Sequence, residues 1–161
     1  MSEINTIQNE SMQGMFLTFN IGTVGYGIEI CHVIEIIGIQ QVTNIPDMPE
    51  YLIGVINLRG KVIPVIDVRL RFGMEERAYD DRTCIIVVSL DDNLVGLVVD
   101  KVSEVVTITE EQIEPQPRLG GNASHYTKGL GKIGDQVRIL LDVGALLDET
   151  DGIEPPLDKA V

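Results

Sequence analysis

The chain consists largely of short apolar runs rich in Val and Ile, which are separated by glycine, proline and acidic turn residues. The runs at residues 16–21 and 26–30 are split by glycines, and those at residues 84–90 and 94–99 flank an Asp-Asp-Asn turn. Short Val- and Ile-rich segments bounded by turn residues are typical of β-strands. Many such strands with frequent turns favour an all-β sandwich or barrel.

Two of the runs lack the alternation of apolar and polar residues that marks a half-buried strand. Residues 62–68 and 139–143 are almost continuously apolar, which predicts strands that are buried on both faces. Proline cannot donate a backbone hydrogen bond, so Pro64 places the first of these strands at a sheet edge or a bulge. Helix is expected as a single turn within residues 70–76 and as a short terminal helix at residues 143–149.

The first half of the chain is repeated in the second half. Residues 26–37 recur as residues 95–106, 69 positions later. Tyr51, Gly54 and Asp67 recur 75 positions later as Tyr126, Gly129 and Asp142. A long period found twice indicates a duplicated small domain, because a solenoid needs at least about three repeats. Each copy, about 65 residues long, has the size of an SH3-like or OB-like barrel.

The duplication suggests how the chain is divided. Residues 1–13 are polar and are expected to form a flexible leader. Residues 14–147 hold the duplicated unit, with the first barrel at about residues 14–80 and the second at about residues 81–147. Residues 148–161 are acidic and contain two adjacent prolines, which predicts a frayed tail. The sequence leaves open whether the two barrels exchange strands.

The distribution of charge argues against nucleic acid as a partner. The formal net charge of the 161-residue chain is −13, and its first basic residue is Arg59. A protein that binds a phosphate backbone must neutralise several phosphates with Lys and Arg. We therefore expect no nucleic-acid partner.

Nothing in the sequence indicates export or membrane insertion. The N-terminus lacks a basic segment followed by an apolar one, and no apolar run approaches the roughly 18 residues of a membrane-spanning helix. Cys31 and Cys84 have neither CxxC spacing nor a histidine cluster near them, so both are expected as small core residues in a reducing compartment. We expect a cytoplasmic protein.

The sequence contains no arrangement that predicts catalysis or a cofactor. His32 and His125 are expected at the surface or half buried, because no motif gives either an oriented catalytic partner. Asp67 and Asp142 occupy equivalent strand ends in the two copies, which favours a capping or turn role over a catalytic carboxylate pair. Metal-binding motifs and phosphate-binding glycine loops are also missing from the sequence. We predict a protein that is not an enzyme and carries no cofactor or metal.

The two copies differ most at one charged turn. The first copy has Asn57-Leu58-Arg59-Gly60 where the second has Lys132-Ile133-Gly134-Asp135. Residues 55–63 have the pattern of a β-hairpin, in which Gly60 can adopt the backbone conformation of the turn. Glu35 lies among apolar neighbours, so it either faces solvent or binds a basic side chain. Two interpretations stay open: a bidentate pair with Arg59, or two unrelated solvated residues.

The residues around this turn resemble those of a known family. Residues 42–46 and 51–69 closely resemble the core signature of the CheW-type chemotaxis coupling proteins, most specifically in the run Gly-Val-Ile-Asn-Leu-Arg-Gly-Lys-Val-Ile-Pro-Val-Ile-Asp. Residues 96–105 and 139–143 match its second half. The resemblance extends from about residue 15 to residue 147, which is almost the whole chain.

The resemblance implies two five-stranded SH3-like barrels packed side by side, and an adaptor that couples methyl-accepting chemotaxis receptors to the histidine kinase CheA. Members of the family bind the regulatory domain of CheA mainly through the first barrel. They bind the cytoplasmic helical tip of the receptor in an apolar groove near the junction of the barrels. A monomer is expected when the protein is free, and a part of a receptor–kinase array when it is bound. Seven positions here are candidates for partner contacts: Glu35, Arg59, Val33, Val42, Gly54, Asn57 and Leu58.

Two other functions are compatible with the predicted fold. The first is a β-barrel protein that binds a small molecule and shares only the fold, since barrels support many functions. A deep pocket with converging polar groups would favour it, whereas a shallow apolar groove would favour the adaptor. The second is a nucleic-acid-binding barrel, which the acidic composition disfavours.

Overall fold

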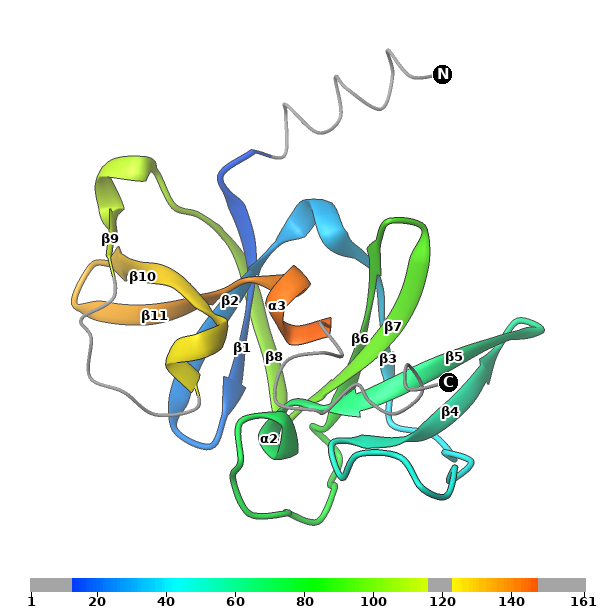
Figure 1. The fold of residues 1–161 in the computed structure, drawn as a ribbon. Coiled ribbons are helices and arrows are strands. Elements are labelled where there is room, and N and C mark those ends of the chain that lie inside the picture. Colours follow the sequence, from blue (N-terminus) through cyan, green and yellow to red (C-terminus); the bar gives the residue numbers. More distant parts are fainter. Residues whose placement is uncertain (1–12, 116–122, 148–161) are drawn as a thin grey trace, which may run out of the picture.

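The computed structural model describes residues 13–115 and 123–147, which form two β-sheets with short helices between them (Figure 1). The six-stranded sheet has the order β8-β1-β2-β11-β10-β9 and contains β1 (Met15–Ile21), β2 (Val24–Glu29), β8 (Lys101–Thr107), β9 (Ile113–Glu114), β10 (Thr127–Ile133) and β11 (Gln136–Leu141). The five-stranded sheet has the order β3-β6-β7-β5-β4 and contains β3 (Val33–Gly38), β4 (Leu52–Leu58), β5 (Lys61–Asp67), β6 (Cys84–Leu90) and β7 (Asn93–Val99). The predicted all-β fold is confirmed, with one short strand, β9, more than the expected two sets of five.

Helices in the described part of the chain are short. They are the 3-10 helices η1 (Ile30–His32), η2 (Glu110–Gln112) and η3 (Ala123–Tyr126) and the α-helices α2 (Val68–Arg71) and α3 (Val143–Leu147). None of the helices in this part is long and apolar enough to cross a membrane. The predicted tail at residues 148–161 and all but the last residue of the predicted leader lie outside the described residues.

Each sheet combines strands from both halves of the chain. The β1–β2 hairpin of the first copy pairs with β8 and β11 of the second copy. Reciprocally, the β6–β7 hairpin of the second copy pairs with β3 and β5 of the first. The pairings of β2 with β11 and of β5 with β7 are parallel, whereas the hairpins themselves are antiparallel. The two copies therefore exchange their first hairpins, which answers the question that the sequence left open.

The largest apolar cluster lies between the two sheets. Phe19 and Ile28 enter it from the six-stranded sheet, Ile86 and Leu97 enter it from the five-stranded sheet, and Leu146 enters it from α3, and all five are fully buried. In Figure 1, α3 accordingly lies between the sheets. Because this cluster draws on both sheets, it joins the two halves of the molecule through apolar burial.

Two smaller clusters cover the opposite faces of the sheets. On β5, Val65 belongs to the cluster of the five-stranded sheet, and the next residue, Ile66, belongs to the cluster between the sheets. On β11, Leu140 and Leu141 divide in the same way between the six-stranded sheet's own cluster and the shared one. The prediction that both strands are buried on both faces is confirmed.

An aspartate at the end of each of these strands caps a short helix. The Oδ1 atom of Asp67 accepts hydrogen bonds from the amides of Arg69 and Leu70, at 2.9 and 3.3 Å, at the start of α2. Asp142 stands in the same place before α3, and its Oδ1 atom accepts a hydrogen bond from the amide of Ala145 at 3.3 Å. The predicted capping role of both aspartates is confirmed.

Of the two positions expected for Pro64, the sheet edge is wrong, because β5 is an interior strand between β7 and β4, whereas the register of β4 against β5 does shift nearby, between Leu52 and Gly54. Pro64 lies opposite Val55 of β4, whose own amide and carbonyl bond to Thr43 and so point away from β5. In such a non-hydrogen-bonded pair the proline nitrogen also faces away from β4, toward β7. Pairing with β7 begins one residue later, at Val65, so no ladder bond is lost.

Two further expectations need correction. The helix expected within residues 70–76 begins at Val68, because Asp67 caps it there, and it ends before Gly73, whose φ of 80° leaves the helical region. Cys31 is exposed in η1 rather than in the core, whereas Cys84 is partly buried against the cluster between the sheets. The burial of the histidines is as expected: His32 is half buried and His125 is exposed.

Asp100, between β7 and β8 of the second copy, joins the turn of the exchanged β1–β2 hairpin to two arginines that follow β5. Its Oδ2 atom accepts hydrogen bonds from the amide of Gly22 in the β1–β2 turn at 2.7 Å, from Nη1 of Arg77 at 2.8 Å, and from Nη2 of Arg69. Burial by itself raises the pKa of this carboxyl group. The hydrogen bonds from Arg69 and Gly22 and the two positive charges together outweigh burial and lower the pKa of Asp100 below its usual value.

We expect Asp100→Asn to lower the free energy of unfolding at pH 7 by about 2 kcal/mol, because the charged acceptor of three hydrogen bonds is lost. Folding lowers the pKa of Asp100, so its stabilising contribution is present above the unfolded-state pKa of about 3.9 and is lost as the pH falls through the folded-state pKa. Urea denaturation should therefore show a full difference from wild type at neutral pH and a smaller one below about pH 4.

The control for this comparison is Asp135→Asn, in the exposed turn between β10 and β11, which should change the free energy of unfolding by less than about 0.5 kcal/mol. A difference for Asp100→Asn that stays constant down to about pH 3 would contradict the assigned network.

Candidate binding surface

The charged turn lies at the tip of the β4–β5 hairpin, which projects from the five-stranded sheet (Figure 1). Arg59 and Gly60 are its two central residues, with φ angles of 52° and 84°. Two adjacent residues with positive φ are characteristic of the type I′ turn of a tight hairpin. The Oδ1 atom of Asn57 accepts a hydrogen bond from the amide of Gly60 at 2.9 Å. The sequence Asn-Leu-Arg-Gly thus fixes the turn, and Arg59 is held in a conformation that is uncommon for a residue with a side chain.

Arg59 forms a bidentate pair with Glu35. Its Nη1 and Nη2 atoms donate to Oε1 and Oε2 of Glu35, each at 2.7 Å. The arginine side chain is 69% exposed and that of the glutamate is 25% exposed. The hydrogen bonds from Arg59 lower the pKa of Glu35, and the carboxylate in turn raises the pKa of Arg59. Of the two interpretations that the sequence allowed, the paired one is confirmed.

The pair joins the two edges of the five-stranded sheet. Glu35 is on β3, at one edge, beside a break in the register between β3 and β6. Arg59 is at the end of β4, the other edge. A planar, bidentate contact fixes the direction of approach as well as the distance. The charged turn therefore links the two edges of this sheet through side chains.

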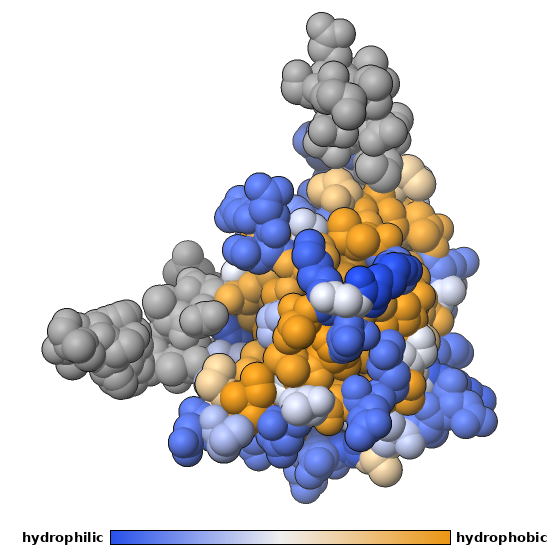
Figure 2. Space-filling model, turned by 90° about the vertical axis from the view of Figure 1, so that its right-hand side faces the viewer, coloured by the Kyte–Doolittle hydropathy of each residue, from blue (hydrophilic) through white to orange (hydrophobic). Residues whose placement is uncertain are grey.

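A shallow hollow of about 420 Å³ lies beneath the pair, and Ile34, Leu58, Ile63, Val87 and Leu94 form its apolar lining. Figure 2 views the molecule from the side of the β4–β5 hairpin and shows a broad apolar area with polar side chains across and around it. An apolar centre beside an exposed arginine is the usual composition of a protein-binding surface.

Three aliphatic side chains on β3 and β5 are exposed, and the sequence alone did not single them out. Ile34 and Ile36 flank Glu35 on β3 and are 52% and 42% exposed, and Val62, after the turn, is 66% exposed. The signal was present in the sequence, because residues 33–37 place four apolar residues around Glu35. The pattern alone could not tell which of them are covered by other strands.

Gly54 is buried and makes room for the segment that precedes β4. A Cβ atom at Gly54 would lie 2.1 Å from the carbonyl oxygen of Thr43 and 2.7 Å from Cγ1 of Val42, and the φ of Gly54 is 147°. Thr43 and Val55 form a two-bond bridge, with N–O distances of 2.8 and 2.9 Å. In the second copy Gly129 is approached in the same way by β9. Gly54 thus determines where residues 42 and 43 lie.

The seven predicted site residues fall into three groups. Glu35, Asn57, Leu58 and Arg59 come together at the hairpin tip. Gly54 lies further along β4, and Val42 lies in the preceding segment, which packs against Gly54 and also lines a second hollow of about 490 Å³. Val33 is half buried against the apolar cluster between the sheets.

The second hollow lies between the loop before β4 and the loop after α2. Val42, Met48, Leu52 and Tyr79 are among the residues that line it. The hydroxyl of Tyr79 donates a hydrogen bond to Oδ2 of Asp67 at 2.7 Å. Burial and this hydrogen bond raise the pKa of Tyr79, so its hydroxyl stays protonated and holds the loop after α2 against the helix cap.

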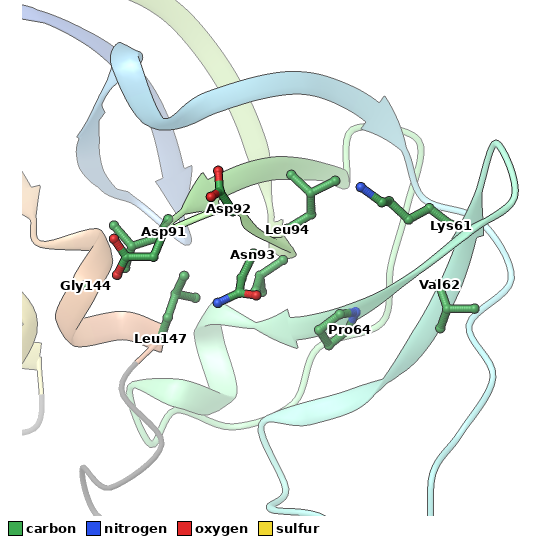
Figure 3. A pocket seen from close by; sticks show the side chains of 11 residues that line it. Lys61, Val62, Pro64, Asp91, Asp92, Asn93, Leu94, Gly144 and Leu147 are labelled. Atoms are coloured by element: carbon green, nitrogen blue, oxygen red, sulfur yellow. The ribbon is translucent and has the colours of Figure 1, made fainter. Parts of the chain in front are cut away.

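A third hollow, of about 640 Å³, lies between β5, the β6–β7 turn and α3 (Figure 3). Its polar side chains include Asp91, Asp92 and Lys61. In Figure 3 the two carboxylates lie on one side and the amine of Lys61 on the other, so these groups do not converge on one point. Among the described residues, no group of three or more His, Cys, Asp or Glu side chains is placed to hold a metal ion. This geometry gives the small-molecule alternative little support.

Known proteins are similar to this chain over most of its length. A family model described as "CheW-like domain" matches residues 15–151. The chemotaxis protein CheW of Klebsiella aerogenes is 39% identical over 152 residues, which cover 94% of this chain and 92% of that protein. The protein FrzA of Myxococcus xanthus is 30% identical over 109 residues, covering 68% of each chain. Among solved structures, the scaffolding protein TtCheW from Thermoanaerobacter tengcongensis matches with a TM-score of 0.79 and 35% identity, over 86% of this chain and 94% of that one.

We expect Gly54→Ala to lower the free energy of unfolding by about 2 kcal/mol, because the added Cβ atom collides with the backbone of Thr43 and the φ of 147° is unfavourable for alanine. Hydrogen exchange of the Val55 amide should accelerate at the same time, since its bond to Thr43 is displaced.

Gly38→Ala is the matched control, because nothing lies within 4 Å of a Cβ atom at that position. It should change the free energy of unfolding by less than about 1 kcal/mol. If both substitutions lowered the free energy of unfolding equally in urea denaturation, the close approach of Thr43 to Gly54 would not be what limits the residue at position 54.

Proposed function

This chain belongs to the CheW-like family, and on that premise we propose that it is an adaptor that couples methyl-accepting chemotaxis receptors to the histidine kinase CheA. The observation that carries the proposal is the bidentate Glu35–Arg59 pair at an exposed hairpin tip, directly beside a shallow apolar surface. The receptor tip and the kinase would both be engaged in the cytoplasm.

The kinase would bind at the hairpin tip. Its regulatory domain is itself a barrel of the same kind, so the partner presents strands and hairpins rather than a flexible peptide. Leu58 and the neighbouring exposed aliphatics would supply apolar burial, and Arg59 would supply orientation. Asn57 would act through the turn, because its side chain holds the Gly60 amide.

The remaining candidates would act at a distance from the tip. Val42 and Gly54 determine how the loop before β4 is placed, so they would shape the edge of the kinase-binding surface. Val33 packs where the five-stranded sheet meets the cluster between the sheets. That place is consistent with a receptor-binding groove near the junction of the two sheets.

The proposed activity is binding without catalysis, in line with the word "scaffolding" in the name of the solved relative. Two separate faces on one small protein can join a receptor tip to a kinase even when each contact is weak. The second contact then forms within an assembled complex, at an effective concentration that reaches millimolar values for short linkages. Modest individual affinities are therefore sufficient for a stable array.

The test is a calorimetric titration of the protein with the isolated regulatory domain of CheA from the same cell. We expect saturable binding by the wild type and binding at least about tenfold weaker for Arg59→Ala, because arginines of this kind often dominate interface energies. The thermal unfolding curve of Arg59→Ala should match that of wild type, since the side chain is mostly exposed.

Lys132→Ala is the matched control, since it removes a cation from the corresponding hairpin of the second copy, and it should bind the regulatory domain as tightly as wild type. Equal binding by wild type and Arg59→Ala would remove Arg59 from the kinase face. If folded wild-type protein did not bind the regulatory domain, the kinase would not be a partner of this chain, and the alternative of a barrel that binds a small molecule would be favoured.

A further inference from the structure

Arg71 is a buried arginine at the boundary between the two copies. It is the last residue of α2, in the first copy, and only 6% of it is exposed. Its Nε atom donates a hydrogen bond to the carbonyl of Leu146 at 3.0 Å, and its Nη2 atom donates to the carbonyl of Ala145 at 3.5 Å. Both carbonyls belong to α3, in the second copy, where the last turn of a helix leaves carbonyl groups for such donors.

The guanidinium of Arg71 also contacts one tyrosine from each copy. Its central carbon lies 4.2 Å from the centre of the Tyr51 ring and 5.0 Å from that of the Tyr126 ring, which is within the range of cation–π attraction. The two tyrosines are equivalent in the repeat. The carbonyl of Tyr51 accepts a hydrogen bond from the amide of Asp67, and that of Tyr126 accepts one from the amide of Asp142, both at 2.8 Å. One cation is thus shared by equivalent rings.

The residue that matches Arg71 in the second copy is Leu146, 75 positions later, and it is fully buried. Arg71 and Leu146 are therefore equivalent positions in direct contact, as expected for residues beside a two-fold axis. If both were arginine, two buried cations would meet at this axis. If both were leucine, no directional bond would cross it. With arginine at one position and leucine at the other, a single guanidinium makes the directional contacts across the axis.

The two copies also differ at the position that follows Arg71 and Leu146. Phe72, which matches Leu147, has its ring centre 5.4 Å from that of Tyr26 and 5.6 Å from that of Tyr126. Tyr26 belongs to the exchanged hairpin of the six-stranded sheet. Two consecutive residues of the first copy thus make contacts between the copies: Arg71 contacts α3, and Phe72 contacts tyrosines on β2 and η3.

We infer that Arg71 is a positioning residue that fixes the angle between the two sheets, and with it the shape of the proposed receptor groove at their junction relative to the kinase-binding face. The apolar cluster between the sheets supplies attraction but little direction, because apolar burial does not depend on orientation. The guanidinium supplies direction, because its planar donors and faces fit only one arrangement of α3 and the two rings. The expected effect of Arg71 on array assembly rests on the proposed function, whereas its effect on the angle between the sheets does not.

The test measures the distance between the sheets by electron–electron double resonance. Spin labels are placed at the tips of the two long hairpins, by Lys61→Cys and Asp135→Cys, in a Cys31→Ser, Cys84→Ser background. We expect one narrow distribution of the distance between the two labels in the otherwise wild-type protein. Arg71→Leu, which fills the site with an apolar side chain, should give a broader distribution or one with two peaks. If Arg71→Leu does not fold, Arg71→Lys serves instead, because lysine keeps the charge but lacks the planar fork.

A double variant tests the symmetry argument. Arg71→Leu combined with Leu146→Arg moves the cation to the equivalent position, where the same two rings and the end of α2 are available to it. This variant should recover the narrow distribution. A distribution as narrow as wild type in Arg71→Leu, or no recovery in the folded double variant, would overturn the inference.

Assembly gives a second readout. Arg71→Leu should bind the CheA regulatory domain as wild type does, because that face lies on one sheet, while binding of the receptor tip at the junction of the sheets, and with it joint binding of both partners, falls about tenfold. Joint binding equal to that of wild type would contradict the functional part of the inference. If the wild type binds neither partner, the proposed function fails, and the distance measurement still decides the role of Arg71.

Discussion

The exchange of the two first hairpins is the constraint on which the rest of the structure depends. Because β2 pairs with β11 and β5 pairs with β7, neither copy forms a complete sheet from its own strands. The apolar cluster between the sheets and the network around Asp100 both join segments that are placed by this exchange. The hairpin that carries Arg59 depends on the exchange as well, because its strand β5 pairs with β7 of the other copy.

Much of this fold could be predicted from the sequence, and the failures have physical causes. Strand positions, the repeat and the caps at Asp67 and Asp142 follow from local patterns, which a single sequence carries. The exchange does not, because exchanged and unexchanged hairpins present the same apolar pattern. The expected edge position of Pro64 was wrong because a proline lacks a hydrogen-bond donor on only one side of one residue. An interior strand can accept it wherever no ladder bond is needed at that point.

The same contrast holds for the binding surface. A carboxylate in an apolar run and the first arginine of the chain suggested the Glu35–Arg59 pair, but spacing alone could not bring β3 and the hairpin tip together. The exposed residues Ile34, Ile36 and Val62 became visible only when the covered faces of the sheet were known. The repeat is symmetric at Tyr51, Gly54 and Asp67, which match Tyr126, Gly129 and Asp142, whereas Arg59 and Arg71 occur in the first copy alone.

The exchange also sets the order in which the molecule can be completed during synthesis on the ribosome. All strands of the five-stranded sheet have been made once residue 99 has been added, so the sheet that carries Arg59 can form early. The β1–β2 hairpin is made first, yet its parallel partner β11 ends at residue 141, near the end of the described chain. Until then one side of β2 is an open edge that other chains could pair with. The nascent protein is therefore most exposed to aggregation at its own first strands.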